Sequence, residues 1–187
     1  MTLADFLFEI GMLKRAKRTG FWFLGQGNES IAEHSYRTTV IGYVLAQKLQ
    51  ANVEKVLLTC LFHDTAEART GDHNYVHKQY VASAEGKARQ DQFAGLPFAR
   101  SILNLLEHFD KRDTLEAKIA YDSDQLDMIL SLKEEQDRGS PYAARWLRSV
   151  TSRLLLPISR DLAREIMQGD SAAWWGLFDS DKQDWFA

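Results

Sequence analysis

Leu61-Phe62-His63-Asp64-Thr65-Ala66-Glu67 places a histidine and two carboxylates directly after a run of apolar residues. The positions before and within it recur at three- and four-residue spacing, which predicts one buried helix face formed by Val53, Val56, Leu57, Cys60 and Leu61. Asp64 continues this stripe, and a charged carboxylate in the core is costly unless a partner or a cation neutralises it. On a continuous helix His63 can turn toward the same point, and Glu67 lies roughly 6 Å further along the axis. The stretch therefore predicts a divalent metal site in which a second carboxylate, Glu67, contacts the water bound to the metal.

The composition is typical of one globular domain. The chain has 187 residues, of which 45% are hydrophobic and 26% are charged, so it does not resemble a disordered chain. Its net charge of −3 gives no electrostatic support for a nucleic-acid polymer as a partner. Cys60 is the single cysteine, so we expect no disulfide and no thiolate metal site. The chain shows no signal-peptide pattern and no run of ~20 apolar residues, so we expect no membrane association and a cytoplasmic location.

Helical periodicity in nearly every long segment predicts an all-α fold, in a single domain spanning residues 1–187. The predicted helices cover residues 3–14, 30–50, 52–70, 75–93, 98–109 and 114–136, with a loop at 19–28 and a final helical section from about 140. Asn52 is the predicted N-cap of the third helix, and Gly71-Asp72 its end. Trp174, Trp175 and Trp185 are interpreted as packing or subunit-interface aromatics, and we expect a homodimer.

Two ligands on adjacent residues rarely hold a catalytic metal, so further ligands are expected upstream. Ile31, His34, Thr38, Ile41 and Leu45 form an inward stripe, which predicts that His34 points toward a neighbouring helix. Taken alone, His34 is better explained as a buried neutral histidine bonded to a backbone carbonyl. Beside His63 and Asp64, the ligand interpretation is favoured.

A fourth ligand is expected in the helix at residues 114–136. Periodicity permits either Asp122 or Asp124 to be buried and does not choose between them, whereas Asp127 is expected to be the most solvated of the three aspartates. A set of two histidines and two aspartates suits Mn²⁺, Co²⁺, Fe²⁺, Mg²⁺ or Zn²⁺ and does not select among them. The remaining histidines are interpreted as surface residues: His73, His77 and His108.

Five ordered blocks resemble the HD-domain metal-dependent phosphohydrolases, and within that family the small proteins with 5′-deoxynucleotidase activity. The blocks are residues 13–20, 29–37, 63–68, 70–72 and 124–130. The resemblance covers roughly residues 5–138 and implies an HD-domain helical bundle, with a helical C-terminal extension at about 140–187. It implies that Asp124 is the fourth metal ligand, beside His34, His63 and Asp64.

The same resemblance implies roles for residues around the metal. Glu67 falls on the carboxylate that positions or deprotonates the attacking water, and Asp72 on an acidic residue near the sugar or leaving group. Arg18 falls on a phosphate-facing arginine. The family places an aromatic beside that arginine, which helps to exclude a 2′-hydroxyl, and the candidates for this position here are Phe21 and Trp22. Lys78 is a second candidate phosphate contact, with a solvated helix lysine as the alternative.

The expected function is removal of the 5′-phosphate from (deoxy)nucleoside monophosphates by a metal-dependent phosphomonoesterase. One alternative is an HD hydrolase of another nucleotide, namely a dNTP, guanosine tetraphosphate or a cyclic dinucleotide. Few basic residues lie near the motifs, which disfavours a triphosphate, and the Gly-Tyr-Pro element of the cyclic-dinucleotide class is absent. The other alternative is a non-catalytic metal-binding protein with a structural or regulatory role. Glu67 favours an enzyme, because a structural site has no use for a carboxylate on the open side of the metal.

Overall fold

The computed structural model describes residues 1–176, in which there are helices and no β-strand. The α-helices are Leu3–Ile10 (α1), Ile31–Leu49 (α2), Val53–Phe62 (α3), Glu67–Thr70 (α4), His77–Tyr80 (α5), Glu85–Phe93 (α6), Ala99–Lys111 (α7), Leu115–Asp137 (α8), Ala143–Thr151 (α9), Pro157–Gln168 (α10) and Ala173–Gly176 (α11). Two short 3₁₀ helices precede α2, namely Gly11–Lys14 (η1) and Thr19–Phe23 (η2). The all-α prediction is confirmed. Among the described helices, none combines the length and the apolar character that a bilayer span requires. Trp185 lies outside the described residues.

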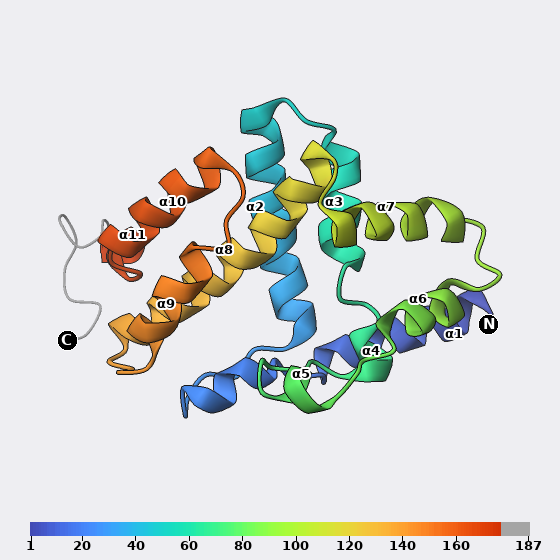
Figure 1. The fold of residues 1–187 in the computed structure, drawn as a ribbon, viewed down its shortest axis with the longest axis horizontal. Helices are drawn as coiled ribbons and strands as arrows, with labels where there is room; N and C mark the ends of the chain where they lie inside the picture. The colour runs from blue at the N-terminus through green and yellow to red at the C-terminus, as the bar shows by residue number, and fades with distance from the viewer. Residues whose placement is uncertain (177–187) are drawn as a thin grey trace.

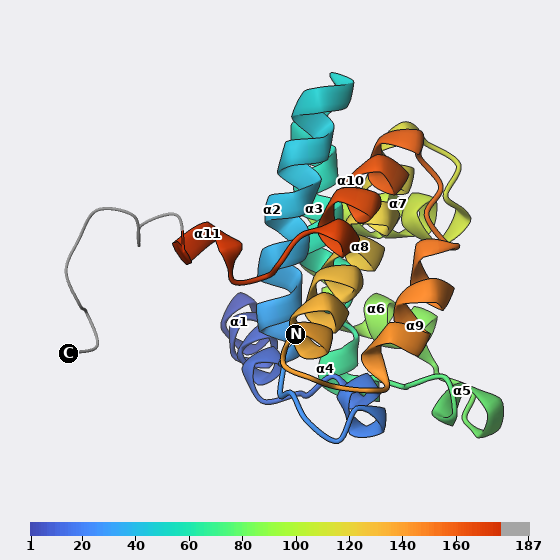
Figure 2. The ribbon, with the colours of Figure 1, turned by 90° about the vertical axis from the view of Figure 1, so that its left-hand side faces the viewer.

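Helix α8 runs through the middle of the molecule and contacts most of the other long helices (Figure 1). Helices α2 and α3 pack against α8 and against each other, and α7 also contacts α3 and α8. Helices α9 and α10 also pack against α8, on the face of the molecule that Figure 2 turns toward the viewer. The largest core cluster joins residues of α2, α3 and α8, including Leu45, Val56 and Leu126, which are fully buried. This arrangement brings the inner faces of α2, α3 and α8 to one point.

Side-chain caps begin the three helices that carry the predicted ligands or lead to them. Ser30, Asn52 and Thr114 each accept a hydrogen bond from the backbone N–H three residues later. Ser30 also forms a reciprocal capping box with Glu33. Each cap satisfies a backbone donor that the first helical turn leaves free. The predicted N-cap at Asn52 and the helix starts at residues 30 and 114 are therefore confirmed.

A glycine permits the close approach of α2 to α3. A Cβ atom on Gly42 would lie 2.7 Å from Cys60 Sγ and 3.0 Å from Val56 Cγ1. Such contacts are too short to be accommodated without movement of one helix, because the core is already close-packed. Gly42 thus sets the distance between α2, which carries His34, and α3, which ends directly before His63.

Three predicted helices are wrong in extent. The helix expected over residues 52–70 ends at Phe62, and the Glu67 N–H donates to Asp64 O, three residues back, so the turn is tighter than an α-helix. Leu61, which was assigned to the buried stripe, is 48% exposed. The segment at 75–93 divides into α5 and α6, because its polar sequence offers no apolar stripe to hold a continuous helix on the core. The first predicted helix ends at Ile10 and continues to Lys14 only as η1.

Asp122 is buried and connects α8 to the C-terminal helices. Its two carboxylate oxygens accept hydrogen bonds of 2.8 Å from the backbone N–H groups of Leu155 and Leu156, just before α10. Sequence periodicity left Asp122 and Asp124 equivalent. The structure gives Asp122 partners that account fully for its burial.

The Asp122→Ala variant should therefore lose about 1–3 kcal/mol of unfolding free energy, because two backbone donors lose their acceptor. Urea denaturation of the metal-free protein measures the difference. The control is Asp161→Ala on α10, where an exposed carboxylate pairs with Arg164 and contributes little. Equal denaturation midpoints for Asp122→Ala and the parent would contradict this role.

Candidate metal centre

His34 lies on the inner face of α2 and is completely buried, as the inward stripe predicts. Its Nδ1 atom is 2.5 Å from Asp127 Oδ2, and the carboxylate can only accept, so Nδ1 carries the hydrogen and donates it. The Nε2 atom is left to face the interior of the cluster. This is the orientation in which a histidine serves as a metal ligand, with a carboxylate fixing the ring from behind.

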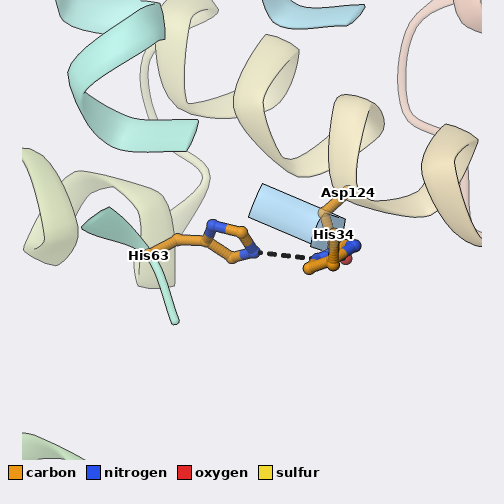
Figure 3. A group of neighbouring side chains, drawn as sticks. All are labelled: His34, His63 and Asp124. Atoms are coloured by element: carbon orange, nitrogen blue, oxygen red, sulfur yellow. Dashed lines mark hydrogen bonds and ion pairs between the residues drawn. The ribbon is translucent and has the colours of Figure 1, made fainter. Parts of the chain in front are cut away.

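His63 is oriented by the same principle, with a different acceptor. It directly follows the last residue of α3, and its Nδ1 donates to the backbone carbonyl of Cys60 at 2.8 Å. The His63 ring also packs against Phe109 of α7, with centroids 5.4 Å apart. Its Nε2 atom consequently points at Nε2 of His34, 3.3 Å away (Figure 3).

Two aspartates approach the same point. Asp64 Oδ2 is 3.1 Å from His63 Nε2 and 3.6 Å from His34 Nε2. Asp124 Oδ1, from α8, is 3.3 Å from His34 Nε2, and Figure 3 shows the Asp124 side chain next to the His34 ring. Donor atoms that share one ion at roughly 2.0–2.2 Å lie about 3 Å from one another. His34, His63 and Asp124 each offer a ligand atom close enough to the other two to share one divalent ion, and Asp64 lies beside both histidines.

The electrostatics of the cluster favour positive charge between the rings. Burial opposes a charged His34, as does the Arg18 charge, but the bonds with Asp124 and Asp127 outweigh both and raise the pKa to about 9. Burial likewise disfavours charged His63, yet Asp64 raises its pKa. In a protein without an ion, a proton on Nε2 meets this demand. A divalent cation would bind the same Nε2 lone pairs, so a proton and a metal ion compete for one position.

Asp127 is the residue that sequence reasoning placed wrongly. It was expected to be the most solvated of the three aspartates and is fully buried. Besides His34, its carboxylate accepts from Arg37 Nε at 2.5 Å and from Arg18 Nη1 at 3.1 Å. Burial alone raises the pKa of Asp127, but the His34 hydrogen bond and the two guanidinium charges hold it below its usual range. The three partners are distant in sequence, so helical periodicity could not reveal them.

Arg18 is also tied to protein carboxylates. Its Nη1 lies 3.0 Å from Glu29 Oε2, in addition to the contact with Asp127. Burial disfavours the charged guanidinium, yet these two carboxylates, with Asp124 and Asp64 contributing, raise its pKa further. Both of these side-chain contacts use Nη1. Arg18 therefore forms an ion pair with Asp127 and places a positive charge near the cluster.

Glu67 is close to the cluster without being a member of it. Burial, followed by the charges of Asp64 and Asp72, raises the pKa of Glu67 to about 10. Its Oε2 atom is buried and has no hydrogen-bond partner within the described part of the chain. A buried carboxyl oxygen without a partner is costly, so the position is explained best by a group that binds there.

Of the other predicted site residues, some lie near Arg18 and others lie away from the cluster. Asp72 Oδ2 accepts from the backbone N–H and the hydroxyl of Thr19, so Asp72 fixes the residue after Arg18. Trp22 is 66% exposed and forms an edge contact with the His77 ring at 5.5 Å. Phe21 packs against the main core, and Lys78 is exposed. Hence Asp72 and Trp22 border the loop that carries Arg18, whereas the structure does not bring Phe21 or Lys78 to the four-residue cluster.

Comparisons with known proteins identify the family to which the chain belongs. The family model described as HD domain matches residues 10–166. A 5′-deoxynucleotidase HDDC2 from Danio rerio is 30% identical over 148 residues, which cover 74% of this chain and 72% of the relative. The 5′-deoxynucleotidase hdd1 of Schizosaccharomyces pombe is 31% identical over 144 residues, covering 72% of each chain.

A solved structure gives the same result for the fold. A conserved hypothetical protein from Pyrococcus furiosus superposes with a TM-score of 0.73 at 30% identity, covering 89% of this chain and 99% of that one. The family match continues through α9 and most of α10, beyond the motif blocks that end near residue 138. On the evidence of its fold, its clustered histidines and aspartates and these matches, the chain belongs to the HD-domain family.

Proposed function

We propose that this chain is a metal-dependent phosphomonoesterase that removes the 5′-phosphate from deoxynucleoside monophosphates. The observation that carries the proposal is the Glu67 carboxyl: its buried Oε2 atom has no hydrogen-bond partner among residues 1–176, and it lies beside a group of side chains that could hold a divalent ion. Relatives from fish and yeast that share about 30% identity are named 5′-deoxynucleotidases, which supports the choice of substrate class.

The proposal assigns the metal to His34, His63, Asp64 and Asp124. When bound there, a divalent ion supplies Lewis-acid activation of a water molecule and neutralises charge on the phosphoryl group. The mixed nitrogen and oxygen donors suit Mn²⁺, Co²⁺, Fe²⁺, Mg²⁺ or Zn²⁺, and the choice among them depends on supply as well as on the site.

Glu67 is assigned to the attacking water. Its Oε2 would hold the water by a hydrogen bond and accept its proton as the new bond to phosphorus forms. The bond from phosphorus to the 5′-oxygen breaks, and the 5′-oxygen takes a proton from solvent to leave as the nucleoside hydroxyl. Positive charge at the cluster offsets the negative charge of Asp64, which is one cause of the raised Glu67 pKa. A bound ion would therefore lower the Glu67 pKa toward the ionised form that a general base requires.

The loop at residues 18–22 is assigned to the substrate. The Arg18 charge, close enough to act on Asp64 and Asp124, stabilises negative charge on the phosphoryl oxygens. We assign Asp72 to holding this loop through Thr19 rather than to proton transfer, because its Oδ2 is already occupied. The exposed Trp22 ring, at the outer edge of the same loop, is assigned to the nucleoside.

The ligand assignment predicts that Asp64→Ala loses the metal. Removing one of two carboxylate ligands leaves the histidines without a shared partner, so metal content falls and the metal-dependent gain in melting temperature disappears. Elemental analysis after dialysis measures the content, with Asp122→Ala as the control that keeps the site intact. A metal content equal to that of the parent would overturn the assignment of Asp64.

The contact between Asp127 and His34 predicts a separate effect on affinity. Asp127→Asn should weaken metal binding ~10–100-fold, the range found when a partner behind a histidine ligand is lost. Competition with a chromogenic chelator measures the dissociation constant. The control is Glu134→Gln, which removes another partner of Arg37 but leaves the contact with His34. Equal losses in the two variants would mean that Asp127 acts only through Arg37.

The proposed reaction is tested by phosphate release from a panel of ribo- and deoxynucleotides with each of the candidate metals. We expect the parent to hydrolyse deoxynucleoside monophosphates, and Glu67→Gln to keep its metal while turnover falls ~10²–10⁴-fold. Ionisation of Glu67 is disfavoured in the folded state, so it lowers the stability of the metal-free protein above the ordinary glutamate pKa.

Glu67→Gln should therefore be at least as stable as the parent at pH 7 without metal. Full activity in Glu67→Gln would remove Glu67 from the reaction. Hydrolysis of dNTPs or guanosine tetraphosphate in preference to monophosphates would favour the other HD hydrolases, and no hydrolysis of any nucleotide would favour a structural metal site.

A further inference from the structure

The turn that carries His63 and Asp64 is not held by helical hydrogen bonds alone. In a continuous α-helix the His63 carbonyl would accept from the Glu67 N–H, four residues later. Here that N–H donates to Asp64 O instead, at 3.0 Å. The His63 carbonyl is thus free to accept from another element, and the conformation of the turn depends on what that element supplies.

Arg89 of α6 reaches the His63 carbonyl. It is 9% exposed, and its Nη2 donates to His63 O at 3.4 Å while Nη1 donates to Asp110 Oδ2 of α7 at 2.6 Å. Its Nε atom is buried without a hydrogen-bond partner among the described residues. A charged side chain is therefore buried with one of its donors unsatisfied, which a purely packing role would not require.

Gln92, one turn further along α6, reaches the next part of the turn. It is completely buried, and its Nε2 donates to Thr65 O at 3.1 Å and to Glu9 Oε1 of α1 at 3.0 Å. Its own Oε1 has no partner in the described chain. Helix α6 lies beside α4, which starts at Glu67 (Figure 1). Arg89 and Gln92 thus contact both carbonyls that flank Asp64.

We propose that Arg89 and Gln92, here named the α6 clamp, are positioning residues of the metal centre. They hold the 63–66 turn so that His63, Asp64 and Glu67 meet the fixed groups on α2 and α8. His34 and Asp124 need no such support, because each lies inside a long helix. This inference rests on the proposed function for its catalytic consequence, although its consequence for metal affinity requires only that the cluster binds an ion.

The test compares Arg89→Met and Gln92→Met with Arg100→Met. Arg100 is exposed on α7 and lines the same groove between α6 and α7 as Arg89, without a hydrogen bond to the turn. Co²⁺ titration against a chromogenic chelator gives the affinity, and the visible spectrum of bound Co²⁺ reports its coordination. Both clamp variants should bind Co²⁺ about 10–100-fold more weakly with an altered spectrum, whereas Arg100→Met should match the parent.

Kinetics at saturating Co²⁺ separate positioning from stability. Because Glu67 begins α4, directly after the turn, clamp variants should lose about 10-fold or more in kcat with KM for the deoxynucleotide little changed. If a methionine variant does not fold, Arg89→Lys retains the charge but not the forked donor, and it should show a smaller loss in the same direction. Parent-like affinity, spectrum and kcat in folded variants would overturn the proposal, even if their melting temperatures fell. If the parent hydrolyses no phosphomonoester, Co²⁺ affinity and spectrum still decide the proposal.

Discussion

Two imidazole Nε2 atoms held 3.3 Å apart inside the protein are the constraint on which this structure depends. Each ring has its Nδ1 atom committed to an acceptor, Asp127 for His34 and the Cys60 carbonyl for His63. Neither ring can rotate away without losing a buried hydrogen bond. The close approach of α2 and α3 at Gly42 keeps the two rings within reach of each other.

The charges around the two histidine rings favour the uptake of a cation. Five carboxyl groups surround the cluster and two guanidinium groups oppose them: Glu29, Asp64, Glu67, Asp124 and Asp127 against Arg18 and Arg37. Asp127 is fully buried and the other four carboxyl groups are partly buried, and such an excess of acid is unfavourable unless protons or a cation are taken up. The raised pKa values of Glu67 and His34 show both as sites of proton uptake in the ion-free protein. A divalent ion among Asp64, Asp124 and the histidines removes the need for those protons.

Sequence patterns predicted the parts of this centre that follow from local periodicity. Apolar spacing was sufficient to place His34 inside α2. The N-cap at Asn52 and the helix starts at residues 30 and 114 were also predicted from the sequence. The end of α3 was not predictable, because the chain leaves the helix at Phe62 without a glycine or proline. Asp127 was expected to be the most solvated of the three aspartates because hydrophobic periodicity cannot detect a carboxylate whose burial depends on Arg18 and Arg37.

Helix α6 shows most clearly why periodicity has this limit. Its sequence is mostly polar, yet it buries Arg89, Gln92 and Phe93 on one face. Hydrophobic patterning measures how much a helix gains from leaving water, whereas α6 meets a turn whose backbone carbonyls require donors. A polar face is the complementary surface for such a turn. The centre therefore combines ligands inside long helices with a turn that another helix supports. The contacts to that turn join segments that are distant in sequence, so local sequence patterns could not predict them.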